Sequence, residues 1–140
     1  MKIKILSAFL LCIFASQPHA ADTPLFRMAA SPAPNAGGIS PGMVFQEVER
    51  SDTASTVELL HPAGSVAAKS MFMLRGACAL AKERGKRAFR LVQLSRPLLR
   101  VSLRFVSEED AGKSAPESLM GEDRVVSAAY CDGIRSVFPE

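Results

Sequence analysis

Residues 71–94 read MFMLRGACALAKERGKRAFRLVQL, and the hydrophobic period changes inside this stretch. Its first half belongs to a helix expected over residues 66–84, because apolar residues recur at the spacing of one helical face. These residues are Ala67, Met71, Leu74, Cys78 and Ala81. Met73 and Leu80 form a second apolar stripe nearly opposite the first. A helix that is apolar on two sides is either sandwiched within a domain or leaves the second stripe available to another surface.

The ends of this helix carry start and stop signals. Ser65 is a suitable N-cap residue. Gly85 suits the left-handed position that follows a helix C-terminus. The stretch is not a membrane span, because Arg75 and Lys82 interrupt the apolar run well before the roughly 18 residues that a span needs.

The second half of the stretch has the period of a strand. AFRLVQLS at 88–95 and LLRVSLRFV at 98–106 flank Arg96 and Pro97, which predicts a β-hairpin. The second run alternates, so one of its faces is apolar and the other is polar. A single core is expected to contain residues from the helix and the hairpin: Met71, Leu74, Cys78, Leu103 and Phe105.

The remaining periodic segments complete a small α+β fold. Residues 42–50 and 53–61 are expected to be strands, residues 124–130 a last strand and residues 131–138 a short C-terminal helix. Residues 107–123 form a polar, acidic loop, with a helical turn suggested by Ser114 and Glu117. These elements predict a small antiparallel sheet with one main helix packed across it.

The chain begins like an exported protein. Residues 1–20 combine Lys2 and Lys4 with a short apolar run and small residues, which is the pattern of a cleavable signal peptide. Cys12 lies inside the apolar run and follows Leu11, where lipidation requires a small residue, so a lipid anchor is not expected. Residues 21–42, rich in proline and glycine, are expected to form a flexible tether. Residues 43–138 then form one domain, and the protein is placed in the periplasm or outside the cell.

Export leaves Cys78 and Cys131 in an oxidising compartment, where an even pair indicates a disulfide. The alternative is a free thiol, for which His61 would be the only histidine partner after the leader is removed. The spacing of the three residues fits no compact zinc motif, so no metal is expected. The sequence shows no phosphate-binding glycine loop and no nucleophile elbow, and no cofactor is expected.

Charge is segregated along the chain. Residues 69–106 carry ten basic residues and one acidic residue, whereas residues 107–140 carry eight acidic and three basic residues. The basic middle is suited to an anionic partner, or else the acidic tail folds back and neutralises it. Nucleic acid is not expected, because the chain is exported and has one Tyr and no Trp.

Three arginines of the hairpin form a candidate anion site: Arg90, Arg100 and Arg104. An odd-numbered hairpin loop, such as residues 96–98, places Arg90 across from Arg104 on the polar face. An even loop directs Arg90 into the core, which is costly for a charge, so the odd loop is favoured. An arginine guanidinium can donate two parallel hydrogen bonds to a phosphate or carboxylate group, such as those of lipopolysaccharide and peptidoglycan. The alternative is that these residues only make the strand face soluble.

The helix and the strand after it resemble a family of small exported bacterial proteins and lipoproteins that have no assigned biochemical function. The residues that carry the resemblance are Arg75, Ala77, Ala81, Gly85 and Phe89. The resemblance implies an envelope protein of α+β type and brings no catalytic residue. The sequence thus favours a non-enzymatic envelope protein that binds an anionic polymer or another envelope protein. The alternative is a small thiol- or histidine-dependent enzyme, and the oligomeric state is left open.

Overall fold

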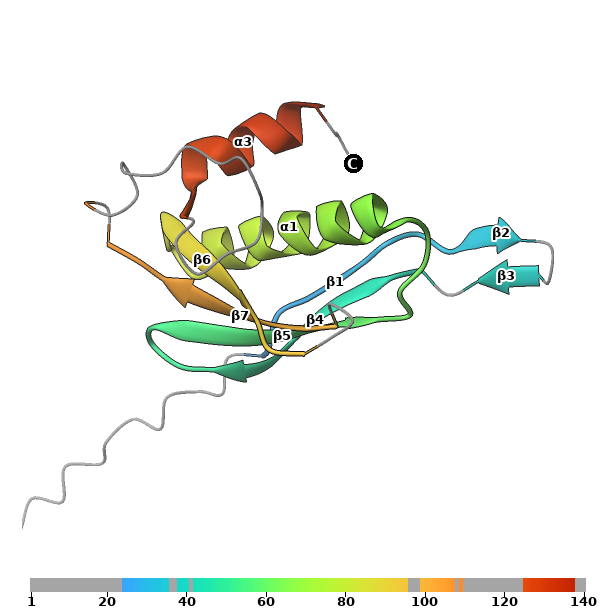
Figure 1. Ribbon diagram of the computed structural model, residues 1–140, viewed down its shortest axis with the longest axis horizontal. Coiled ribbons are helices and arrows are strands. Elements are labelled where there is room, and N and C mark those ends of the chain that lie inside the picture. The colour runs from blue at the N-terminus through green and yellow to red at the C-terminus, as the bar shows by residue number, and fades with distance from the viewer. Residues whose placement is uncertain are drawn as a thin grey trace, which may run out of the picture.

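A computed structural model describes residues 24–35, 38–40, 42–95, 99–107, 109 and 125–137. Figure 1 shows a curled antiparallel sheet, a long helix lying across one face of it, and a second helix on the far side of the long one. The sheet order is β1 (Arg27–Ala29), β4 (Val44–Arg50), β5 (Ala54–Leu60), β7 (Arg100–Phe105), β6 (Ala88–Gln93) and β8 (Val126–Ser127). The helices are α1 (Val66–Glu83) and α3 (Ala128–Val137), and β2 (Ala33–Asn35) pairs with β3 (Gly38–Ser40) in a separate hairpin. The α+β fold is therefore confirmed.

Helix α1 begins and ends at the residues that its sequence predicts. The Ser65 hydroxyl accepts a hydrogen bond from the Ala68 amide at 3.1 Å. At the other end, Gly85 adopts a φ of +64°, a conformation that most side chains disfavour. The amides of Gly85 and Lys86 then donate to the carbonyls of Lys82 and Ala81. These two bonds satisfy carbonyls that a helix end otherwise leaves without a partner.

Apart from Ala67, which is exposed, and Met71, both apolar stripes of α1 are buried, so the helix is sandwiched rather than open on its second side. Met73 and Leu80 are fully buried, and Leu74 and Cys78 belong to the same core. Gly76 lets the helix approach the sheet closely, since a Cβ there would lie 2.4 Å from the Phe45 ring. Of the residues expected to share one core, Leu103 is also inside, Phe105 packs against it, and Met71 is only half-buried.

The hairpin formed by β6 and β7 has the predicted odd register. Arg90 pairs with Arg104, and Phe89 and Leu91 pair with Phe105 and Leu103. The apolar side chains face α1, which keeps the arginines on the opposite face of the sheet. Strand β5 continues this register, because Glu58 pairs with Arg100 on the other side of β7.

The prediction of a flexible tether over residues 21–42 is wrong for residues 24–30, which belong to the folded domain. Strand β1 pairs with β4, and the Phe26 ring packs edge-on against Phe45 at 5.9 Å between centroids. The Glu47 amide donates to the Phe26 carbonyl at 2.9 Å. Residues 24–30 are thus an edge of the domain, fixed by partners about twenty residues ahead in the chain.

The prediction of a strand through residue 130 is also wrong. Strand β8 has two residues, and α3 begins directly after it. The Ser127 hydroxyl accepts from the Tyr130 amide at 3.2 Å, so Ser127 caps the helix where a longer strand was expected. The predicted C-terminal helix is present but starts earlier. The leader and the turn at Ser114 and Glu117 lie outside the described residues.

Among the described residues, no helix is long and apolar enough to cross a membrane.

The core assignment predicts that Leu74→Ala lowers the free energy of unfolding by about 2 to 5 kcal/mol, because a fully buried leucine leaves a cavity. Leu94→Ala is the matched control, since Leu94 is 50% exposed, and its effect should stay below about 0.5 kcal/mol. Urea unfolding of both variants measures the difference. Equal effects at the two positions would show that Leu74 does not lie in the core.

Candidate functional site

A disulfide joins the two helices. Cys78 of α1 and Cys131 of α3 are bonded, with their Cα atoms 5.6 Å apart, which confirms the predicted pair. Each cysteine is nearly buried. Both sulfurs are consumed in the bond, so neither is a free nucleophile in this state.

Helix α3 has few other means of attachment. Cys131 is its only buried residue, and Tyr130 and Ile134 are partly buried against the core. A ten-residue amphipathic helix with so little buried surface is not stable by itself in water. The disulfide is therefore the main bond that keeps α3 on the outer side of α1, where Figure 1 shows it.

A cavity of about 320 Å³ lies where the C-terminal end of α1, the start of β6 and α3 meet. One part of its lining is apolar: Cys78, Ala81, Phe89, Ala128 and Cys131. The other part is charged, with the cationic residues Lys82, Lys86, Arg87 and Arg135 and the single acidic residue Asp132. Gly85 completes the lining. The cavity thus combines an apolar wall with an excess of positive charge.

The local structure explains why the cations gather at this point. The turn at Gly85 ends α1 and begins β6 within a few residues, so Lys82 and Lys86 lie on the same side of the fold. Arg135 comes from α3 and is 3.5 Å from Asp132 one turn earlier. The Lys86 ammonium also lies 5.6 Å from the centre of the Phe105 ring. Backbone amides already donate to the carbonyls of Ala81 and Lys82. The side chains of Lys82 and Lys86 are therefore not needed to cap the helix.

The three predicted hairpin arginines share the outer face of the sheet but do not form a uniform site. Arg100 is held by Glu58, with 2.7 Å between the guanidinium and the carboxylate. Arg90 and Arg104 are cross-strand neighbours. Glu49, on the same face, accepts a hydrogen bond from Thr56. This face therefore carries both positive and negative groups, which is typical of a soluble sheet surface.

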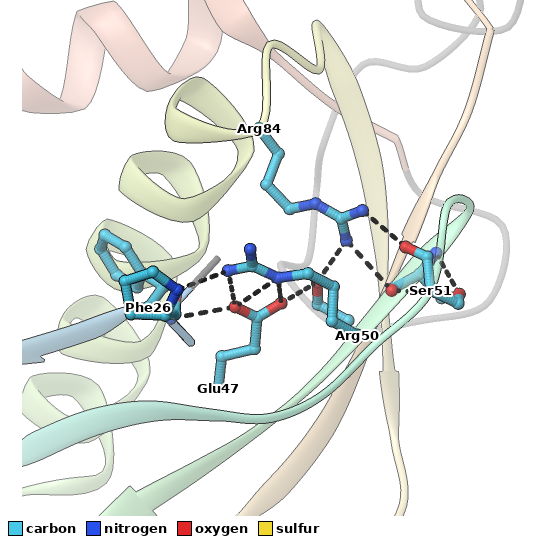
Figure 2. A network of polar contacts seen from close by, with 8 residues as sticks. Phe26, Glu47, Arg50, Ser51 and Arg84 are labelled. Carbon is cyan, nitrogen blue, oxygen red and sulfur yellow. Dashed lines mark hydrogen bonds and ion pairs between the residues drawn. The ribbon is translucent and has the colours of Figure 1, made fainter. Parts of the chain in front are cut away.

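A buried polar network, which the sequence does not predict, lies on the inner face of the sheet, as Figure 2 shows. The Glu47 side chain is fully buried, and its carboxylate accepts hydrogen bonds from the Arg50 guanidinium, the Phe26 amide at 3.0 Å and the Ser55 hydroxyl at 2.6 Å. A bulge between Glu47 and Glu49 shifts the register of β4. This shift places Arg50 on the same face of the strand as Glu47.

Arg84 extends the network to the end of α1. Its guanidinium donates to the Ser55 hydroxyl at 2.7 Å and to the carbonyls of Ala54 and Ser51. It also lies 4.8 Å from the centre of the Phe105 ring. Figure 2 shows that these bonds connect the helix end to the turn between β4 and β5. The network joins β1, the β4–β5 hairpin and α1, so its role is structural.

The electrostatics of Glu47 agree with that role. Burial raises the pKa of its carboxyl, but hydrogen bonds from Arg50, Phe26 and Ser55 lower it by more, and the pKa falls below its ordinary value. The same hydrogen bond from Arg50 raises the pKa of that guanidinium. A carboxylate that is held ionised by three donors is a poor proton acceptor for catalysis at neutral pH.

The potential metal ligands lie apart from one another in the part of the chain that the structure describes. No group of three or more potential ligands comes together there. His61 is exposed at the end of β5 and has a φ of +52°. It does not line the cavity at the disulfide.

Comparisons with protein-family models, curated proteins and solved structures found no match to this chain.

The buried network predicts that Glu47→Gln lowers the free energy of unfolding by about 1.5 to 3 kcal/mol at pH 7, because charged hydrogen bonds are lost. A lowered pKa stabilises the fold above the carboxyl's ordinary pKa of 4.5, and this contribution is lost as the pH falls through the folded-state value. The difference between wild type and variant should thus be constant at neutral pH and shrink in acid.

Glu49→Gln is the control, since Glu49 is exposed on the same strand. Urea unfolding between pH 3 and pH 7 measures both variants. A difference for Glu47→Gln that is independent of pH, or no larger than that for Glu49→Gln, would contradict the network's contribution.

Proposed function

We propose that this chain is an exported, non-enzymatic protein of the bacterial envelope that binds an anionic component of that envelope in the cavity beside the disulfide. The leader pattern of residues 1–20 supports export. A disulfide between Cys78 and Cys131 is compatible with an oxidising compartment. The resemblance of α1 and β6 to small exported bacterial proteins supports the same placement.

The composition of the cavity lining is the observation that carries the proposal. Four cationic side chains and one carboxylate line a concave site. Charges at the rim of a concavity act across less water than charges on an open surface, so they attract an anion more strongly. Arginine and lysine are the side chains that bind phosphate and carboxylate groups. Neither a phosphate nor a carboxylate needs a catalytic group in order to bind there.

The outer sheet face is the second candidate for anion binding. It offers Arg90, Arg100 and Arg104, as the hairpin register predicts. Arg100 already pairs with Glu58, as Arg135 does with Asp132 in the cavity, but the outer face of the sheet is open to solvent, which screens its charges. The cavity is therefore favoured over the sheet face.

The thiol-dependent enzyme is the alternative from another class. It requires that Cys78 or Cys131 be reduced, whereas the structure joins them. A reduced Cys78 would lie mid-helix against the core, where a thiol is usually inert. The binding protein needs neither condition.

Two matched triple variants test the proposal, because each removes three positive charges. One is Lys82→Gln/Lys86→Gln/Arg135→Gln in the cavity, and the other is Arg90→Gln/Arg100→Gln/Arg104→Gln on the sheet face. Retention of the mature protein on purified lipopolysaccharide and peptidoglycan is measured at low and high salt. The cavity variant should lose about tenfold or more in retention, the sheet-face variant should retain like wild type, and wild-type retention should weaken with salt.

Circular dichroism and urea unfolding check that both variants fold. Equal losses in the two variants would indicate a general charge effect rather than a site. A loss confined to the sheet-face variant would move the site to the hairpin arginines. No retention of the wild-type protein on either polymer would contradict anion binding.

A further inference from the structure

The cavity beside the disulfide has two chemically different walls, and the difference bears on the ligand. Its cations come from the end of α1, the start of β6 and α3, whereas the disulfide, Ala81 and Phe89 form a continuous apolar wall. Ala81 and Phe89 are almost completely buried, and so are the cysteines. A bare inorganic anion would use only the cations and would make no contact with the apolar wall.

The size of the cavity limits the ligand further. A volume of about 320 Å³ lies at the lower end of the range of small-molecule sites. A polymer chain does not fit inside it, but an end group or a short chain does. Hydrophobic burial rewards a ligand whose apolar part covers the wall while its charged group stays at the cations.

We propose that the cavity binds a compact amphiphilic anion, in which a phosphate or carboxylate group is attached to a short alkyl chain. The anionic group lies at Lys82, Lys86 and Arg135, and the alkyl chain lies against the disulfide and Phe89. This inference rests on the proposed function, since it specifies the ligand class of the same site. It adds that the apolar wall contributes to affinity.

Helix α3 is required for such a site. Ala128 and Cys131 supply part of the apolar wall, and Arg135 supplies one of the cations. Cys131 is covalently joined to Cys78 of α1, so the bond forms part of the wall and also holds the wall's two halves together. The site is therefore complete only in the oxidised protein.

Isothermal titration of the mature, oxidised protein with a homologous series of ligands tests the inference. The series runs from inorganic phosphate through methyl, butyl and hexyl phosphate, with the matching alkyl carboxylates in a second arm and hexanol as the uncharged control. Affinity should rise by up to about fourfold for each buried methylene and then level off when the wall is covered. Comparison of the two arms identifies which anionic group the cations prefer. Hexanol should bind at least tenfold more weakly than hexyl phosphate.

Two variants separate the walls. Ala128→Leu occupies part of the cavity from an exposed helical position, where leucine is a good helix former. It should flatten the dependence on chain length, so that the ratio of hexyl phosphate affinity to inorganic phosphate affinity falls below that of the wild type. Lys82→Gln/Lys86→Gln should weaken every anion by a similar factor and keep the dependence on chain length. Urea unfolding confirms that both variants fold.

The outcomes distinguish this inference from the proposed function. If every anion binds with the same affinity whatever its chain length, the apolar wall is not used, and the inference fails while anion binding in the cavity stands. If hexanol binds as tightly as hexyl phosphate, the cations are not used, and both fail. If no member of the series binds but lipopolysaccharide or peptidoglycan still retains the wild type in a cavity-dependent way, the compact-ligand inference is overturned and the proposed function survives.

Discussion

The covalent bond between Cys78 and Cys131 is the constraint on which the outer half of this structure depends. Helix α1 packs on the sheet, where Gly76 lies against the Phe45 ring and the stripe of Met73 and Leu80 is buried. Helix α3 buries much less, because only its cysteine is buried and Tyr130 and Ile134 are partly buried against the core. The two cysteines are 53 residues apart in the sequence. In the chain-entropy model, a cross-link that closes a loop of this length stabilises a domain by about 4 kcal/mol. That contribution is large beside the roughly 5 to 15 kcal/mol of a whole small domain.

The two polar features at the end of α1 have opposite roles. On the sheet side, Arg84 and Arg50 are fully engaged with Glu47, Ser51 and Ser55, and they fix the helix to the first hairpin. On the α3 side, Lys82 and Lys86 face a cavity instead of a carboxylate network. The basic segment at residues 69–106 thus supplies Arg84, which holds α1 to the first hairpin, and also supplies Lys82 and Lys86 of the candidate binding site. Sequence charge alone does not separate these roles, because the direction of each side chain depends on the turn at Gly85.

Local patterns were sufficient for the elements that have strong periodicity or definite end signals. Ser65 and Gly85 marked the ends of α1, and the cost of burying Arg90 selected the odd register of the second hairpin. Export to an oxidising compartment predicts the cysteine pair, but it does not predict the cavity beside the disulfide. Strand β1 was missed because its only strong signal is Phe26, whose partner Phe45 is far along the chain. The Glu47 network was missed because a bulge in β4, invisible in the sequence, places Arg50 beside it.

The candidate site could be predicted only in part. The excess of basic residues in 69–106 was evident, and an anion-binding role followed from it. Strand alternation places the three hairpin arginines on one face, whereas the structure shows Glu58 bound to one of them. The cavity needs Arg135, which lies in a different charge region of the sequence and is brought to α1 by the disulfide. A covalent link between distant segments gives no periodic signal that would predict such a site.

Amide hydrogen exchange of α3, compared between the oxidised protein and Cys78→Ser/Cys131→Ser, measures whether the disulfide holds this helix. The amides of residues 131–137 should lose their protection in the variant, while those of α1 and β5 in the same molecule exchange more slowly than α3. Protection of α3 that stays equal in the two proteins, relative to α1, would contradict the claim that the disulfide holds the helix and builds the cavity.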